Sequence, residues 1–174
     1  FLAVLVFLVY LFVAEPIPLE ITAICIGVFM VLMGITDVKD AWAPYMHPVV
    51  IFIMCCLIFA IALEKAGLRN GMTISTHHHF RNGDFLANQV FDIAKDMGIK
   101  GLRWFPSASF LCHEHLIQYL EDGTIQRIEG SMNGPLGRFV SEGGMEGTGV
   151  LRSHGGRYQA VQDGEVKIDI AVIG

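Results

Sequence analysis

The chain has 174 residues and a net charge of −5, and its charges are spread very unevenly. Only seven charged residues precede position 69, whereas residues 69–174 contain 12 acidic and 10 basic residues. The first 68 residues carry too little polar surface to face water on all sides. This composition excludes a single soluble domain and predicts two regions, residues 1–68 and residues 69–174, that fold in different solvents.

Cysteine usage and the chain ends add two expectations. Cys25, Cys55 and Cys56 lie in apolar runs and Cys112 stands alone in the second region, so no disulfide framework or oxidising compartment is indicated. The chain opens inside an apolar run without an initiator Met or a basic segment, and it ends just after the apolar run 168–173. Both ends are therefore expected to be fragment ends.

Three uncharged apolar runs dominate the first region and predict an all-α transmembrane segment of two to three helices. The expected spans are about residues 1–14, 18–36 and 46–63, the third beginning near Pro48. A span needs about 20 apolar residues, and only the run 41–63, with 23 residues, reaches that length unaided. Three buried helices of a soluble core are the alternative, which the lack of any polar face at helical spacing disfavours.

The residues around the third run give a weak orientation. Trp42 and Tyr45 precede it, where amphipathic rings favour the headgroup level. Lys65 and Arg69 follow it, so the positive-inside rule places its end in the cytoplasm. Acidic and basic residues are absent from the middle of the runs, so the first region offers no ion pathway of its own.

This region also contains five short motifs, at residues 15–18, 34–35, 40–43, 48–50 and 62–68. Together they resemble the N-terminal helices of the divalent-anion:sodium symporters, a family that carries citrate and other dicarboxylates. The resemblance implies membrane localisation for residues 1–68, with the lipid bilayer as their partner. The Ser-Asn-Thr hairpin motifs with which that family binds sodium and carboxylate are absent, so transport by this chain alone is not expected.

From Gly71 onward, short β-rich runs alternate with amphipathic stretches. This alternation predicts a mostly parallel sheet with helices on both faces. Asp84 is the expected N-cap of the first helix, which stops at Gly98. The expected strands are 72–76, 102–105, 124–128, 149–152 and 168–173, and the expected helices are 86–97, 113–120, 135–140 and 157–161.

Ligands of such sheets bind at the carboxyl ends of the strands, and two glycine-containing loops, residues 77–83 and 153–157, are expected there. Free N–H groups at helix starts favour anions, and Arg81 and Arg157 add forked donors for phosphate or carboxylate. Neither loop is a Walker A or dinucleotide fingerprint, and glycine turns with solvated basic residues remain the alternative. The candidate binding residues are His78, His79, Phe80, Arg81, Asn82, Gly83, Ser153, His154, Gly155, Gly156 and Arg157.

No metal site is predicted. In an extended segment His78 points away from its two histidine neighbours, and no other Cys/His set at zinc spacing accompanies them. The run Cys112-His113-Glu114-His115 is not a zinc-protease motif, because Ile117 stands where the second histidine would be. Spacing also suggests no Ser/His/Asp or Cys/His catalytic arrangement.

The second region contains ordered motifs at residues 70–84, 134–137 and 153–157, followed by residues 168–171. They resemble the N-terminal part of the citrate lyase alpha subunit, a citrate CoA-transferase. The resemblance implies an α/β parallel-sheet, CoA-transferase-like fragment in the cytoplasm. In that family citryl replaces acetyl on a thioester and acetate is released, so the two loops would hold CoA-like phosphates or citrate carboxylates.

The resemblance also implies partners: a beta subunit that cleaves the citryl thioester and an acyl carrier protein (gamma) subunit. A CoA-like phosphopantetheine thioester would carry the acyl group, and no cofactor is expected to stay bound. The family attacks with a glutamate expected later in the subunit. None of the acidic residues here lies in a corresponding motif, so no catalytic residue is assigned, no turnover by this chain is expected, and no nucleic-acid partner is indicated.

Residues 65–68 fit both resemblances, and a shared segment is where two genes would be joined. A chimeric reading frame is the first hypothesis, and a natural bifunctional protein is the alternative; amplification of genomic DNA across the codons for residues 64–71 would distinguish them. As to function, a citrate lyase alpha fragment is the first hypothesis and a fragment of a sodium-coupled citrate/dicarboxylate transporter is the second.

Overall fold

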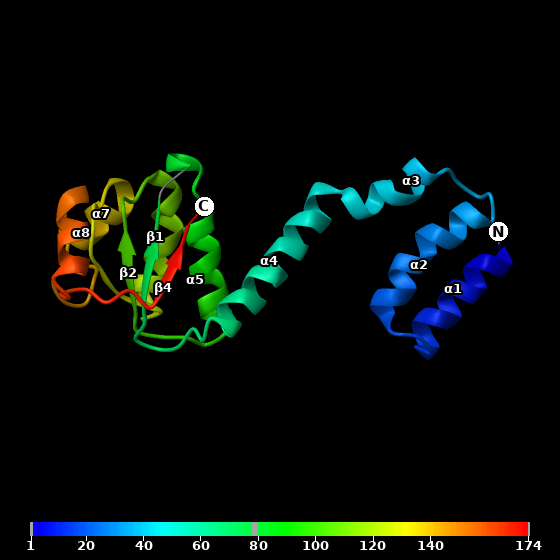
Figure 1. Cartoon of the computed structure of the whole chain (residues 1–174), viewed down its shortest axis with the longest axis horizontal. Coiled ribbons are helices and arrows are strands. Elements are labelled where there is room, and N and C mark those ends of the chain that lie inside the picture. Colours follow the sequence, from blue (N-terminus) through cyan, green and yellow to red (C-terminus); the bar gives the residue numbers. More distant parts are fainter. Residues whose placement is uncertain (1, 78–79, 174) are drawn as a thin grey trace. The chain divides into compact units, whose positions relative to one another are not determined.

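The computed structural model describes residues 2–77 and 80–173, which divide into two compact units, Phe1–Leu57 and Ile58–Gly174. The first unit is helical, and its long helices occupy the three apolar runs (Figure 1). A short helix and a 3-10 turn that the sequence did not predict precede the long helix of the third run. The elements are α1 (Leu2–Ala14), α2 (Leu19–Leu32), α3 (Val38–Trp42), η1 (Ala43–Met46) and the first part of α4 (Pro48–Lys65).

An aromatic pair, a hydrogen bond and a close ring contact join the helices of the first unit. The rings of Phe7 and Phe29 lie 6.3 Å apart between α1 and α2. Tyr45 donates a hydrogen bond to the carbonyl oxygen of Ala23 (2.6 Å), and its ring lies so close to Gly27 that an added Cβ would approach it to 3.3 Å. Among the described helices, only α4 is long and apolar enough to cross a membrane, by length and composition alone.

The second unit is an α/β fold, and its described residues form four strands, all parallel, in the order β3-β2-β1-β4. The alternation of strands and helices predicted in the sequence is therefore confirmed. The elements are β1 (Thr73–Thr76), η2 (Arg81–Gly83), α5 (Leu86–Asp96), β2 (Leu102–Pro106), η3 (Leu111–Leu116), α6 (Ile117–Glu121), β3 (Ile125–Ile128), α7 (Gly134–Ser141), α8 (His154–Gln162) and β4 (Ile170–Val172).

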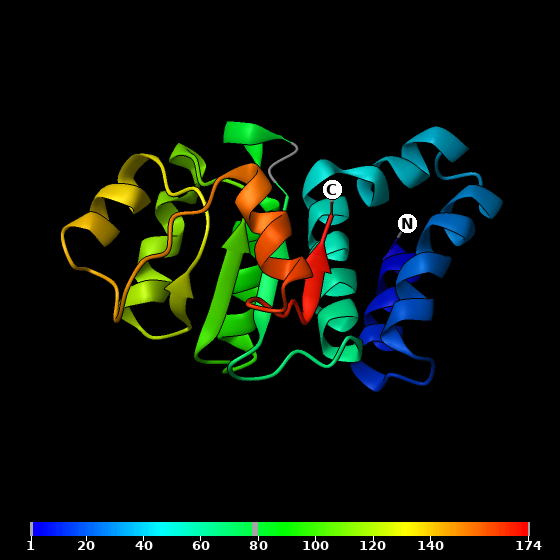
Figure 2. The same cartoon turned by 60° about the vertical axis from the view of Figure 1, so that its left-hand side comes forward.

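Helices cover both faces of this sheet, with α5 and α8 on opposite sides (Figures 1 and 2). Because side chains alternate along a strand, Ile74 and Trp104 enter the main core with the apolar stripe of α5. Phe105 faces the other way and packs with Ala160 of α8 in a smaller core. The apolar core on the α8 side of the sheet is therefore the smaller of the two.

Three local predictions were wrong. Asp84 does not cap α5, since the N-cap position is Phe85 and the Asp84 side chain is buried beside His113. The strand expected at 149–152 is only an isolated bridge between Val150 and Glu129, because the chain turns into α8 immediately afterwards. The helix expected at 113–120 is a 3-10 turn followed by one short α-helix, η3 and α6.

Gly130 allows the chain after β3 to pass close to the end of β2. Its φ is +153°, and a Cβ there would lie 2.3 Å from the carbonyl oxygen of Pro106. Gly130→Ala is expected to lower the free energy of unfolding by about 1–3 kcal/mol through overpacking and backbone strain. Gly155→Ala is the matched control, since its Cβ would meet open space. Urea denaturation of both variants measures the difference, and equal stability would contradict the close approach.

Candidate functional site

A hollow of about 450 Å³ lies at the carboxyl ends of β1, β2 and β4, beside α8. The chain runs from β1 outward to β2 and β3, and then returns to place β4 on the other side of β1. Parallel sheets bind ligands where the strand order reverses in this way, because the connecting helices diverge and leave a crevice. The hollow occupies this switch point between β1 and β4.

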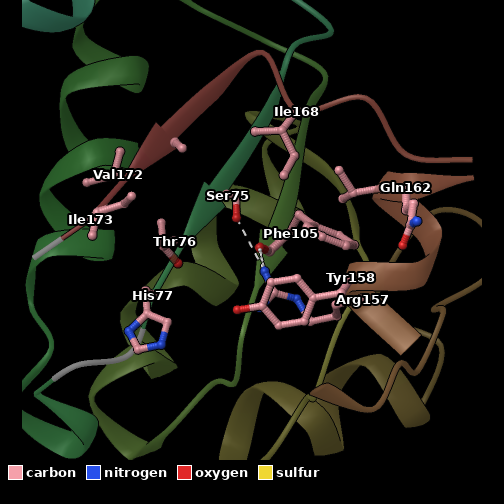
Figure 3. Close-up of a pocket in the computed structure, with 12 residues that line it drawn as sticks. Ser75, Thr76, His77, Phe105, Arg157, Tyr158, Gln162, Ile168, Val172 and Ile173 are labelled. Carbon is pink, nitrogen blue, oxygen red and sulfur yellow. Dashed lines mark hydrogen bonds between the residues drawn. The ribbon is translucent and has the colours of Figure 1, made fainter. Parts of the chain in front are cut away.

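The lining of the hollow combines an apolar wall with polar groups (Figure 3). The wall comes from α8, the end of β2 and the edge of β4; the polar groups come from the end of β1 and from α8. The apolar residues are Phe105, Val161, Ile168, Ala171, Val172 and Ile173, and the polar residues are Ser75, Thr76, His77, Arg157, Tyr158 and Gln162. Such a lining suits a ligand with an apolar stem and a polar or anionic end.

Arg157 is the cation of this hollow and also ties α8 to the sheet. Its Nη2 donates hydrogen bonds to the carbonyl oxygen of Phe105 (2.8 Å) and to the hydroxyl of Ser75 (3.3 Å). The guanidinium lies over the Phe105 ring, 4.5 Å from its centroid. Burial lowers the pKa of Arg157, although the group remains a cation at neutral pH. The Nη2 group of the guanidinium therefore already donates its hydrogen bonds within the protein.

Of the described residues of the first predicted loop, His77 lines the hollow, whereas those from Phe80 to Gly83 do not. His78 and His79 fall outside the described residues, and Phe80, Arg81, Asn82 and Gly83 form η2 and its N-cap. The Asn82 side chain accepts a hydrogen bond from the backbone N–H of Cys112 (3.0 Å), so η2 packs on η3. Burial raises the pKa of the Cys112 thiol, which does not favour a reactive thiolate.

The second predicted loop forms the start of α8. Ser153 is the N-cap, and its hydroxyl accepts a hydrogen bond from the N–H of Gly156 (3.0 Å). Of the described candidates from both loops, Arg157 alone lines the hollow, whereas Ser153, His154, Gly155 and Gly156 do not. The structure therefore brings Arg157 together with the ends of β1 and β4, and of the described residues in the two loops only His77 and Arg157 meet at the hollow.

Comparison with known proteins identifies the family of the second unit. The family model for "Citrate lyase, alpha subunit (CitF)" matches residues 55–174, more than half of the chain. The chain belongs to the citrate lyase alpha subunit family. Over 120 residues it is 41% identical to the citrate lyase alpha chain of Klebsiella pneumoniae and 39% identical to that of Escherichia coli K12.

A solved structure agrees with this assignment. The crystal structure of the putative alpha subunit of citrate lyase from Streptococcus mutans, in complex with citrate, is 42% identical in sequence and matches 66% of this chain with a TM-score of 0.65. That match covers 23% of the S. mutans chain, and the E. coli and K. pneumoniae relatives are covered to 24%. The chain thus spans about a quarter of the length of these citrate lyase alpha subunits.

The first part of the chain matches a different family. The model described as "Citrate transporter" matches residues 9–86 and overlaps the citrate lyase match over residues 55–86. Both resemblances drawn from the sequence are therefore confirmed. The region common to both is longer than the predicted junction at 65–68, and it includes the second half of α4 and β1.

Sequence reasoning missed most of the lining of the hollow. Ser75 and Thr76 end the strand before the first loop, and Val172 belongs to the last strand. The general rule that ligands bind at strand ends could have indicated all three. The sequence did not reveal that β4 pairs with β1. Beside this pairing, the backbone N–H of Thr73 donates a hydrogen bond to the side chain of Asp169, which lies 96 residues away in the sequence.

Proposed function

We propose that the α/β unit binds the acyl thioester and carboxylate substrates of a citrate CoA-transferase in the hollow beside α8. The proposal is supported mainly by the position of the hollow at the switch point of the parallel sheet. The chain that forms this sheet belongs to the citrate lyase alpha subunit family. Its apolar wall suits a phosphopantetheine stem, and Arg157 and His77 suit a carboxylate such as citrate or acetate. No resident cofactor is required, because the CoA-like thioester is itself the carrier.

Turnover by this chain alone is not part of the proposal. Transfer through an acyl anhydride needs a carboxylate nucleophile next to the thioester carbonyl. Among the described residues, none that lines the hollow is Asp or Glu. The proposed role is therefore binding, in the cytoplasm, within a citrate lyase assembly that supplies the beta subunit and the acyl carrier protein (gamma) subunit.

Val161→Asp tests the hollow directly. Val161 contributes to its apolar wall and is partly exposed, so the change should leave the fold intact while placing a charge against an apolar stem. We expect binding of acetyl-CoA to weaken by at least about tenfold, or ~1.4 kcal/mol. Isothermal titration of the full chain in detergent micelles with acetyl-CoA, acetyl-pantetheine and citrate measures the change.

Leu151→Asp is the matched control for that variant. Leu151 is also an exposed apolar residue, and it lies outside the lining of the hollow. Its replacement should leave all three affinities unchanged. Equal losses in the two variants, or none in Val161→Asp, would show that the thioester does not bind beside α8.

A second proposed function, from a different class, concerns the first unit. The citrate transporter match and the apolar composition of α4 support membrane association of residues 1–68, as in a fragment of a citrate/dicarboxylate carrier. Carbonate extraction of membranes containing the full chain tests it. Retention in the pellet supports the association, and complete release contradicts it.

A further inference from the structure

The last turns of α4 belong to the α/β core. Leu63 is 3% exposed within the main core, and Phe59 and Ala60 pack against the same cluster. The helix ends in a Schellman-type cap: Gly67 has φ +78°, and the N–H of Leu68 donates to the carbonyl oxygen of Leu63 (3.1 Å). Leu68 is buried with Leu63, so this cap fixes the helix to the start of the sheet.

The rest of α4 has the surface of a lipid-facing helix. Residues 49–55 are exposed in succession and include no charged side chain, so apolar surface surrounds the whole helix. A single protein partner would cover one side of such a helix, whereas acyl chains cover all of it. Ile58 and Ile61, at 62% and 52% exposed, extend that surface past the point where the opposite side enters the α/β core.

Helix α4 is too short to span a bilayer while its last turns remain packed in the α/β core. A helix rises about 1.5 Å per residue, so residues 48–58 cover about 16 Å, roughly half of a hydrocarbon core of about 30 Å. Even a span that continued to Leu63 would reach only about 24 Å. Any spanning arrangement must therefore place Phe59 to Leu63 in lipid, and that removes them from the core of the α/β unit.

We propose that a lipid bilayer and the α/β core compete for residues 59–63 of α4. In one state the α/β unit is complete and α4 does not span. In the other state α4 spans and the α/β core lacks its first helix. The inference goes beyond the proposed binding function, because it concerns which part of the chain lipid can cover while the sheet remains folded.

Two reporters in the full chain test the competition. Trp42→Phe leaves Trp104, fully buried in the α/β core, as the single tryptophan. Ile61→Cys, in a background with the four native cysteines changed to alanine, reports access of a water-soluble maleimide to the exposed side of α4. The protein is reconstituted into phosphatidylcholine vesicles and separated into carbonate-extracted and carbonate-resistant pools.

We expect every pool with native Trp104 emission to be labelled at position 61 and released by carbonate. Any carbonate-resistant pool should show red-shifted emission and protection of position 61. If only one of these pools forms, lipid and the α/β core do not compete for residues 59–63, and the proposal fails. A carbonate-resistant pool with native emission and a protected position 61 would overturn the proposal.

Lengthening α4 should remove the competition. About nine leucines inserted between Leu57 and Ile58 bring the lipid-facing part to about 20 residues, enough to span. This variant should combine carbonate resistance with native Trp104 emission in one pool. A glycine-serine insertion of equal length is the matched control and should not combine them. If the leucine variant still showed either property without the other, the competition would not be a matter of length and the proposal would fail.

Discussion

Replacing Glu129 with alanine is expected to lower the free energy of unfolding of the α/β unit by about 3 kcal/mol, near the lower end of the range for breaking a buried ion pair. The Glu129 side chain is 5% exposed and forms ion pairs with Arg103 Nη2 (2.7 Å), Arg127 Nη2 (3.0 Å) and Arg152 Nε (3.4 Å). Its removal leaves three guanidinium groups facing one another without their shared counter-ion. Their partial exposure to water keeps the loss from being larger.

Glu165→Ala is the matched control for this effect. Glu165 also pairs with Arg152, through Nη2 at 3.1 Å, but it is exposed to solvent. Exposed pairs contribute only about 0–1 kcal/mol, so this variant should be nearly neutral. Urea denaturation of the full chain in detergent, followed by Trp104 emission in the Trp42→Phe background, compares the two. Similar losses in both variants would mean that burial of Glu129 does not determine its contribution.

The elements of the α/β unit that could be predicted are those with strong local signals. Helix α5 has a stripe of apolar residues at helical spacing and ends before Gly98, whose φ is +72°. Strands β1, β2 and β3 are short runs rich in β-branched or aromatic residues between turn residues. The strand expected at 149–152 failed because such a run needs a neighbour along its whole length, and the chain pairs only Val150 with Glu129 before it turns.

The third apolar run shows a different limit of prediction from sequence. Residues 46–63 were predicted as a span, a prediction that the structure does not test, and α4 occupies most of this run. Phe59 and Leu63 nevertheless pack in the α/β core. An uncharged apolar segment looks the same in sequence whether lipid or a protein core will cover it. Only the three-dimensional contacts separate the lipid-facing turns of α4 from its last ones.

The site was only partly predictable for a related reason. Arg157 was expected to bind an anion because glycines and a helix start surround it. Its position in the hollow fits that expectation, but two of its contacts, to Ser75 and Phe105, are with the protein itself. Those contacts depend on how α8 crosses the sheet, which is a matter of tertiary packing. The sequence motif therefore indicates the residue, and the fold determines how much of its fork a ligand can use.

Arg157→Ala is expected to lower the free energy of unfolding by about 2–4 kcal/mol. The change removes a cation–π contact with Phe105 and leaves the carbonyl oxygen of Phe105 without its hydrogen bond from the side chain. The hydroxyl of Ser75 loses its contact with the guanidinium as well. Arg138→Ala is the matched control and should cost little, because Arg138 is an exposed residue of α7. The same urea titration measures both.

Arg157→Lys separates charge from geometry. Lysine keeps the positive charge of the hollow but lacks the planar fork that reaches two acceptors while lying over a ring. We therefore expect this variant to lose most of the stability that Arg157→Ala loses. Full stability in the lysine variant would show that α8 is held by charge alone. Since α8 and the end of β1 both line the hollow, its shape depends on this guanidinium, and binding in the lysine variant should weaken in parallel with stability.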